Sequence, residues 1–274
     1  MVHLKSAREI DRLRASADLV VRTLAEVARH VRPGISTLEL DTIAEDYIRS
    51  HNAVPAFKGY QVGGLVFPNT LCMSVNDVVV HGIPKKAPLQ DGDLLSADCG
   101  VVFDGYYGDS AYTFAVGEIS EERAILCQVT YEALLCGIAE ARMGNRIGDI
   151  SYAVQSHCEE YGYGVVRDLV GHGIGRGLHE DPQVPNFGRR GTGRKLKPGT
   201  TICIEPMINR GTADVGTDAD GWTVRTSDGH ASAHYEHMVA VRRGGDAEVL
   251  TDFSIVEAEL DPPPYQLNGV VNHG

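Results

Sequence analysis

Apolar residues recur at three- and four-residue steps in the first fifty positions, the spacing of amphipathic helices. Two Ser-x-x-Glu stretches, 6–9 and 36–39, have the form of capping boxes, which begin helices. The helix after Ser6 is expected to bury Ile10, Leu13, Ala17, Val20, Leu24, Val27 and Val31. The helix after Ser36 is expected to bury Leu40, Ile43, Ala44, Tyr47 and Ile48. Arg32-Pro33-Gly34 separates the two, because proline and glycine both interrupt a helix.

Strand patterns dominate the next part of the chain. Residues 53–83 indicate loops and short strands, and Asp91-Gly92-Asp93 indicates a turn. Asp104-Gly105 suits the two-residue primed turn of a β-hairpin, because both positions of that turn need positive φ angles. In such a hairpin the residue numbers of two paired residues add up to 209. Asp98 therefore lies opposite Ala111 and diagonal to Asp109. Diagonal partners lie about 7–8 Å apart at Cα, a distance at which two carboxylates can share metal ions.

After Ser120 the order of elements repeats. Residues 121–142 predict a helix, Arg142-Met-Gly144 ends it, and residues 149–161 predict another. Gly92 precedes Asp98 by the same interval at which Gly199 precedes Glu205. We therefore expect an α+β fold of two pseudo-symmetric α-β halves, about 6–116 and 120–243, whose antiparallel strands face one site. Without a Pro/Ser-rich linker, residues 1–260 are expected to form a single domain, with 261–274 as a C-terminal extension at the surface.

Composition narrows the class of protein. The 274 residues are 43% hydrophobic and 23% charged, which is ordinary for a globular protein. The net charge of −12 and the lack of long Lys/Arg clusters argue against nucleic acid and membranes as partners. The six cysteines lack a CxxC pair and are expected to be reduced core residues. No signal peptide and no membrane-spanning run is evident, so we expect a cytoplasmic protein.

Several residues whose side chains can bind metal ions lie in or near the predicted strands. Glu205 ends the apolar strand 200–206, on the face of Thr201 and Cys203, and residues 233–241 predict a second strand that carries Glu236. His172 and His179 lie among four glycines. Taken alone, Asp98 and Asp109 could be solvated strand residues, and each histidine could be a structural one. The set that we expect to bind metal is Asp98, Asp109, His172, Glu205 and Glu236.

Four clustered carboxylates cannot all stay ionised without cations, because like charges at close range raise pKa values. Two divalent ions per chain would neutralise them. An oxygen-rich set with one imidazole suits Mn²⁺, Co²⁺ or Fe²⁺ better than structural zinc. Such two-metal sites activate a bridging water or hydroxide for hydrolysis. Glu205, held rigidly beside Pro206, is expected to be the general base that accepts the proton of this water.

These five residues, with the motif from Cys72 through Asn76 and His81 to Pro84, resemble the type I methionine aminopeptidases. The resemblance runs from about Ser6 to Val241. It implies a pita-bread fold and removal of the initiator methionine from nascent proteins and peptides whose second residue is small. It also implies that His81 and His179 contact the scissile peptide as catalytic residues together with Glu205. The residues that it places around the methionine side chain are Tyr60, Phe67, Cys72 and Trp222.

Three departures from the family pattern lie near the expected pocket. Leu178 stands where an aromatic residue is common, Gln61 to Val66 resembles a short insertion, and Gly211 to Asp220 is a Gly/Asp-rich expansion. Each could change side-chain preference or access. The expected partners are N-termini of nascent polypeptides and, transiently, the ribosome, although no zinc-binding or PxxP extension precedes Ser6 to dock there. The protein is expected to be a monomer.

Two alternatives differ from this interpretation. Prolidase and aminopeptidase P share the fold but usually carry an additional N-terminal domain, whereas only 97 residues precede Asp98. A non-enzymatic binding protein on the same scaffold would be expected to have lost ligands, whereas all five are present. A hydrolase that acts on N-terminal methionine therefore remains the expected function.

Overall fold

The computed structural model describes residues 2–266. Its helices are α1 (Ala7–Ala28), α2 (Thr37–Ser50), α3 (Glu121–Glu140), α4 (Ile147–Glu160), α5 (Ser254–Glu257) and a 3₁₀ turn, η1 (Pro264–Gln266). The strands before α3 are β1 (Val54–Pro55), β2 (Gln61–Val62), β3 (Leu65–Val66), β4 (Leu71–Val75), β5 (Val78–Val80), β6 (Leu94–Phe103) and β7 (Tyr106–Ala115). Those after α4 are β8 (Gly164–Val165), β9 (Gly171–Gly173), β10 (Glu180–Val184), β11 (Thr201–Ile204), β12 (Met207–Asn209), β13 (Val215–Thr217), β14 (Val224–Thr226), β15 (Ser232–His234), β16 (His237–Ala240) and β17 (Glu248–Val249).

Both predicted capping boxes are confirmed. The Ser6 N–H donates to the Glu9 carboxylate at 2.9 Å, and the Ser36 N–H donates to the Glu39 carboxylate at 2.9 Å. The fourth helix begins two residues earlier than predicted, at Ile147, because Asp149 lies in its first turn and accepts the Arg146 N–H at 2.7 Å. A carboxylate in the first turn stabilises the positive end of a helix, so Asp149 marks the start without being its first residue.

The predicted hairpin has the expected register. β6 and β7 pair along their whole lengths, with Asp98 opposite Ala111. The turn residues Asp104 and Gly105 have φ angles of 49° and 76°, as a primed turn requires. On the other side of β6, β4 places Cys72 opposite Asp98, so a predicted pocket residue lies beside a predicted metal ligand.

The predicted strand 233–241 is wrong as one unit, because Tyr235 and Glu236 separate β15 from β16. β15 pairs with β12, whereas β16 pairs with β11 in a different sheet. The backbone of Glu236 pairs instead with β7: its N–H donates to the Ala111 carbonyl at 2.9 Å, and its own carbonyl accepts the Ser110 hydroxyl at 2.6 Å. Since β7 belongs to the first half, these hydrogen bonds connect the two halves at Glu236, a predicted metal ligand.

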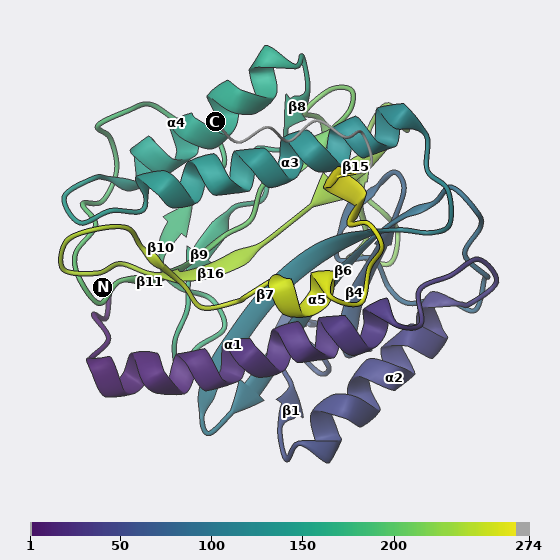
Figure 1. The fold of residues 1–274 in the computed structure, drawn as a ribbon, viewed down its shortest axis with the longest axis horizontal. Helices are drawn as coiled ribbons and strands as arrows, with labels where there is room; N and C mark the ends of the chain where they lie inside the picture. The colour runs from purple at the N-terminus through teal and green to yellow at the C-terminus, as the bar shows by residue number, and fades with distance from the viewer. Residues whose placement is uncertain (1, 267–274) are drawn as a thin grey trace.

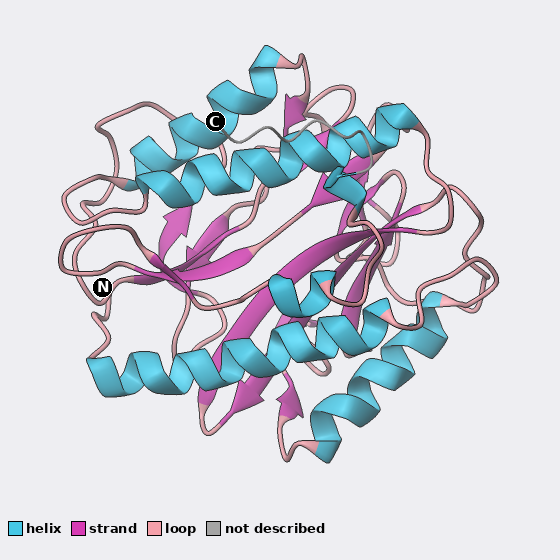
Figure 2. Cartoon of the chain, viewed as in Figure 1, coloured by secondary structure: helices cyan, strands magenta, loops and turns pink. Residues whose placement is uncertain are grey.

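The elements of each half lie together. Figure 1 shows α1 and α2 in one part of the view and α3 and α4 in the other, with β6, β7, β11 and β16 between them. The strands, coloured magenta in Figure 2, form five sheets over residues 2–266, and every pairing between them is antiparallel. The α+β class and antiparallel pairing are therefore confirmed, although the strands are divided among several sheets.

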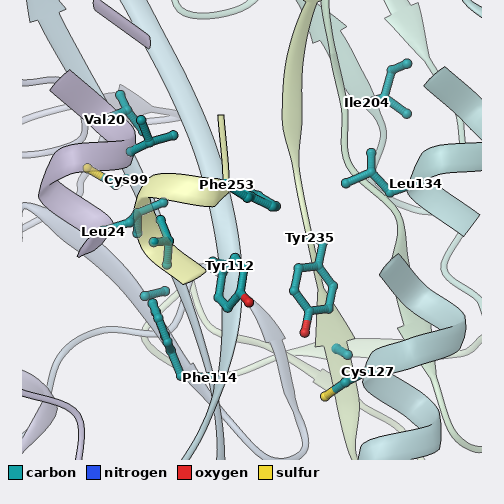
Figure 3. Packing of buried hydrophobic residues seen from close by; sticks show 14 of the residues in the cluster. Val20, Leu24, Cys99, Tyr112, Phe114, Cys127, Leu134, Ile204, Tyr235 and Phe253 are labelled. Carbon is teal, nitrogen blue, oxygen red and sulfur yellow. The ribbon is translucent and has the colours of Figure 1, made fainter. Parts of the chain in front are cut away.

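Large aromatic side chains fill the space between the halves (Figure 3). The ring of Tyr112 on β7 lies 5.2 Å from Tyr235 and 4.9 Å from Phe253, centroid to centroid. Tyr265 stacks on Tyr131 of α3 at 4.1 Å and is 8% exposed. The first part of the segment predicted as a surface extension is thus packed against the core, and residues 267–274 lie outside the described residues.

Two further expectations concern cysteines and membranes. All six cysteines are free thiols, and five of them are buried, which confirms their prediction as reduced core residues. Within residues 2–266 no helix is both long and apolar enough to cross a membrane.

Candidate active site

The five predicted metal ligands line one cavity of about 450 Å³. Asp98 and Asp109 come from β6 and β7 of the first half. His172 comes from β9, Glu205 follows β11, and Glu236 occupies the break before β16, all in the second half. The cavity therefore lies where the two halves meet.

Donor atoms approach one another closely in this group. His172 Nε2 lies 3.5 Å from Glu205 Oε1 and 3.7 Å from Asp109 Oδ2. Donor atoms of Asp109, His172, Cys203 and Glu236 all lie within 4.8 Å of one another, a spacing that one metal ion could bridge. Cys203 was not a predicted ligand, although the alternation of β11 places it on the same face as Glu205.

Within residues 2–266, no lysine or arginine forms an ion pair with these carboxyl groups, whose nearest basic groups are imidazoles. Burial raises the pKa of Asp98 to about 7, and burial together with neighbouring carboxylates raises the pKa of Asp109, Glu205 and Glu236 well above the ordinary range. Asp98 Oδ1, Asp109 Oδ1 and Glu236 Oε1 are buried without a hydrogen-bond partner among the described residues. Since buried polar atoms are nearly always paired, these orphaned oxygens fit divalent cations.

His172 has the form of a metal-binding imidazole. Burial and the neighbouring His179 lower its pKa to about 4, so the ring is neutral at neutral pH. Its Nδ1 lies 3.0 Å from the Gly173 carbonyl, which can only accept, so Nδ1 carries the proton. The Nε2 lone pair therefore faces Asp109 and Glu205, where a cation would bind.

The apolar end of the cavity contains all four predicted side-chain pocket residues: Tyr60, Phe67, Cys72 and Trp222. The Phe67 and Trp222 rings meet edge to face at 5.3 Å. Phe57, which sequence reasoning missed, packs in the same cluster, and so does Leu178. The sequence feature that could have identified Phe57 as a pocket residue is its position in the aromatic stretch just before Tyr60.

Two segments that were expected from the sequence to be departures from the resembled family both reach this cavity. Gln61 to Val66 forms the β2–β3 hairpin, and Val62 lines the cavity wall. The segment from Gly211 to Asp220 contains β13, whose Thr217 also lines the cavity. Both segments therefore contribute a residue to the lining of the cavity.

The two predicted catalytic histidines also line the cavity. Burial lowers the pKa of His81 to about 4, and its φ of 57° is unusual for a residue other than glycine. His179 is exposed within the cavity, and reduced hydration lowers its pKa. Its ring lies 4.5 Å from that of His172, and its Nδ1 lies 2.7 Å from the Tyr60 hydroxyl.

One polar residue of the site had not been foreseen. His234 is 2% exposed, and its Nε2, without a hydrogen-bond partner among the described residues, lies 4.0 Å from Glu205 Oε2. Burial lowers its pKa to about 3, so the imidazole is neutral. Its position two residues before Glu236 was the available signal.

Comparisons with known proteins place this cavity in context. Residues 11–243 match Metallopeptidase family M24. The chain is 49% identical to a methionine aminopeptidase of Clostridium acetobutylicum over 92% of this chain and 99% of that protein. It is 46% identical to methionine aminopeptidase 1 of Bacillus subtilis over 89% of this chain and 97% of that protein.

Solved structures resemble the fold to different degrees. The crystal structure of methionine aminopeptidase from Rickettsia prowazekii matches with a TM-score of 0.89 and 41% identity, over 92% of this chain and all of that chain (100%). The prolidase from Pyrococcus horikoshii matches with a TM-score of 0.73 and 20% identity, which shows a shared fold alone. The match spans 91% of this chain but 63% of the prolidase chain.

Proposed function

The chain belongs to the methionine aminopeptidases of metallopeptidase family M24, and we propose that it removes the initiator methionine from nascent proteins and peptides whose second residue is small. The observation that carries the proposal is one cavity that joins five metal-type ligands to an apolar pocket. Assay of release of the first residue from Met-Ala-Ser and from an Xaa-Pro peptide tests it against the prolidase-like alternative.

We propose that Asp98, Asp109, His172, Glu205 and Glu236 hold two divalent cations, Mn²⁺, Co²⁺ or Fe²⁺. Cations there would polarise the peptide carbonyl and lower the pKa of the attacking water. Glu205 accepts the proton of that water as general base, because its carboxylate faces the same space as His172 Nε2. His81 and His179 donate hydrogen bonds to the reacting peptide, and the methionine side chain enters between Phe67, Cys72 and Trp222.

His179 and His172 are expected to differ when each is replaced by Ala. His179→Ala should lower kcat and kcat/KM together by about 10²–10³-fold and leave KM nearly unchanged, because an oxyanion donor acts in the transition state. His172→Ala should lose metal affinity as well as rate. Steady-state kinetics and bound-metal analysis on both variants check this, and the roles are reversed if His179→Ala is the variant that empties the site.

Cleavage is expected only when a small residue follows the methionine. The apolar, sulfur-containing pocket suits an unbranched thioether, and we expect the glycine-rich walls near His172 and His179 to limit the room beyond it. A peptide series Met-Xaa-Ser, with Xaa from Gly to Arg, checks the second position. Efficient release of Leu or Lys, or of Met before Glu or Arg, would contradict this specificity.

The setting of the reaction is also proposed. We infer a cytoplasmic monomer that meets its substrates as their N-termini emerge from the ribosome and associates with the ribosome transiently. Co-sedimentation with ribosomes and light scattering of the purified protein test these two points. We also propose that residues 1–260 act as one domain, since the main core cluster joins residues of both halves.

A further inference from the structure

Tyr60 makes a polar contact that its place in the apolar pocket does not require. Its hydroxyl lies 2.7 Å from His179 Nδ1, and the two rings meet edge to face with centroids 5.4 Å apart. The other ring nitrogen of His179, Nε2, forms no hydrogen bond among the described residues. The Tyr60 contact is therefore the hydrogen bond that orients this imidazole within the described chain.

Backbone hydrogen bonds hold Tyr60 in place. The Tyr60 N–H donates to the Phe57 carbonyl at 2.8 Å, and the Tyr60 carbonyl accepts the Phe67 N–H at 2.9 Å. The Gly59 N–H donates to the Phe67 carbonyl at 2.9 Å. The β2–β3 hairpin is thus closed at its base, and these hydrogen bonds join the Tyr60 backbone to Phe57 and Phe67, which also line the cavity.

The direction of the hydrogen bond follows from the chemistry of the two groups. A neutral imidazole carries its proton on one ring nitrogen and a lone pair on the other. The hydrogen-bond partner of either nitrogen decides which of the two is protonated. A phenol is the more acidic of the two donors, and its oxygen, conjugated with the ring, is a poor acceptor. Burial raises the pKa of Tyr60, so the hydroxyl keeps its proton.

We propose that Tyr60 is a positioning residue whose hydroxyl donates to His179 Nδ1 and so keeps the His179 proton on Nε2, where it can be donated to the substrate. This inference rests on the proposed function, in which His179 stabilises the developing oxyanion. Without the hydroxyl, the proton distributes between the two nitrogens, and a fraction of molecules present a lone pair to the oxyanion. Tyr60 acts here through His179 and not only as a wall of the pocket.

Tyr60→Phe tests the proposal because it keeps the ring and removes only the hydroxyl. We expect kcat and kcat/KM to fall together by about 3- to 10-fold, the effect of one lost hydrogen bond, with KM and the preference for methionine unchanged. Tyr107→Phe is the matched control, because the Tyr107 hydroxyl forms no hydrogen bond among the described residues, and it should leave kcat unchanged. In a His179→Ala background, Tyr60→Phe should have no further effect on kcat.

The tautomer itself can be measured without turnover. In metal-free protein labelled with ¹⁵N-histidine, His179 should show a protonated Nε2 in the wild type and a mixture of both tautomers in Tyr60→Phe, with His179→Ala identifying the signals. An unchanged tautomer in Tyr60→Phe, or equal effects of Tyr60→Phe with and without His179, would overturn the proposal. An inactive wild type with the expected tautomers would overturn the proposed function instead.

Discussion

Removing divalent cations is expected to abolish turnover, and returning Mn²⁺, Co²⁺ or Fe²⁺ to the metal-free protein is expected to restore it. The reason is the set of buried carboxylates, whose orphaned oxygens no protein group satisfies within residues 2–266. Dialysis against EDTA, followed by metal analysis and a Met-Ala-Ser assay, checks this result. Full turnover by protein shown to be free of metal would end the dinuclear interpretation.

The same carboxylates predict how the stability of the metal-free protein depends on pH. Their pKa values are raised in the folded state, to about 7 for Asp98, so the folded protein binds protons that the unfolded chain has released. The stability that these protons confer is full below about pH 4 and is lost as the pH rises through the folded pKa values.

Buried histidines act in the opposite direction over a lower range. The pKa of His81 and of His172 is about 4 when folded, below the ordinary value of 6.5, so the stability that they contribute rises with pH and levels off only above about pH 7.5. Above about pH 7.5 the carboxyl groups alone dominate, so the melting temperature of metal-free protein should fall from about pH 7.5 upward, and added metal should raise it more at about pH 9 than at about pH 7.5. Thermal melts at both pH values, with and without metal, check this, and a constant metal-free melting temperature would contradict it.

Glu205→Gln is expected to lower kcat by about 10²–10⁴-fold while the fold survives. Gln keeps the size and shape of the side chain and one acceptor oxygen, but its amide cannot accept the proton of water. Glu205 is suited to this role because it follows the buried strand β11, precedes Pro206, and directs its two oxygens toward His172 and His234. Near-normal turnover would move the base elsewhere, with Glu236 the next candidate.

In Glu205→Gln, the loss of a metal ligand must be distinguished from the loss of the general base. Turnover should therefore be measured at several metal concentrations, with bound metal determined at each. If Glu205 is the base, kcat stays low at metal saturation. Recovery of kcat at high metal would assign Glu205 to ligation alone. Circular dichroism and thermal melts of Glu205→Gln, compared with wild type, report on the fold.

The sequence alone determined the local structure around several of the site residues. The hairpin register followed from Asp104-Gly105, because that dipeptide specifies a turn whose twist fixes every later pair. Two helix starts followed from Ser-x-x-Glu, because a capping box involves only four consecutive residues. The five candidate ligands could likewise be named from residue type and strand context, because both are properties of short stretches of sequence.

Only the tertiary structure decided which side chains meet. The break at Glu236 depends on backbone pairing with Ala111, 125 positions earlier in the chain, and no local pattern encodes that contact. Cys203 and His234 join the site because β11 and β15 meet strands from other segments, and Tyr60 reaches His179 across 119 positions. Local sequence sets backbone conformation through neighbouring atoms, whereas the distances between donor atoms are set by how the two halves pack, which depends on the whole core.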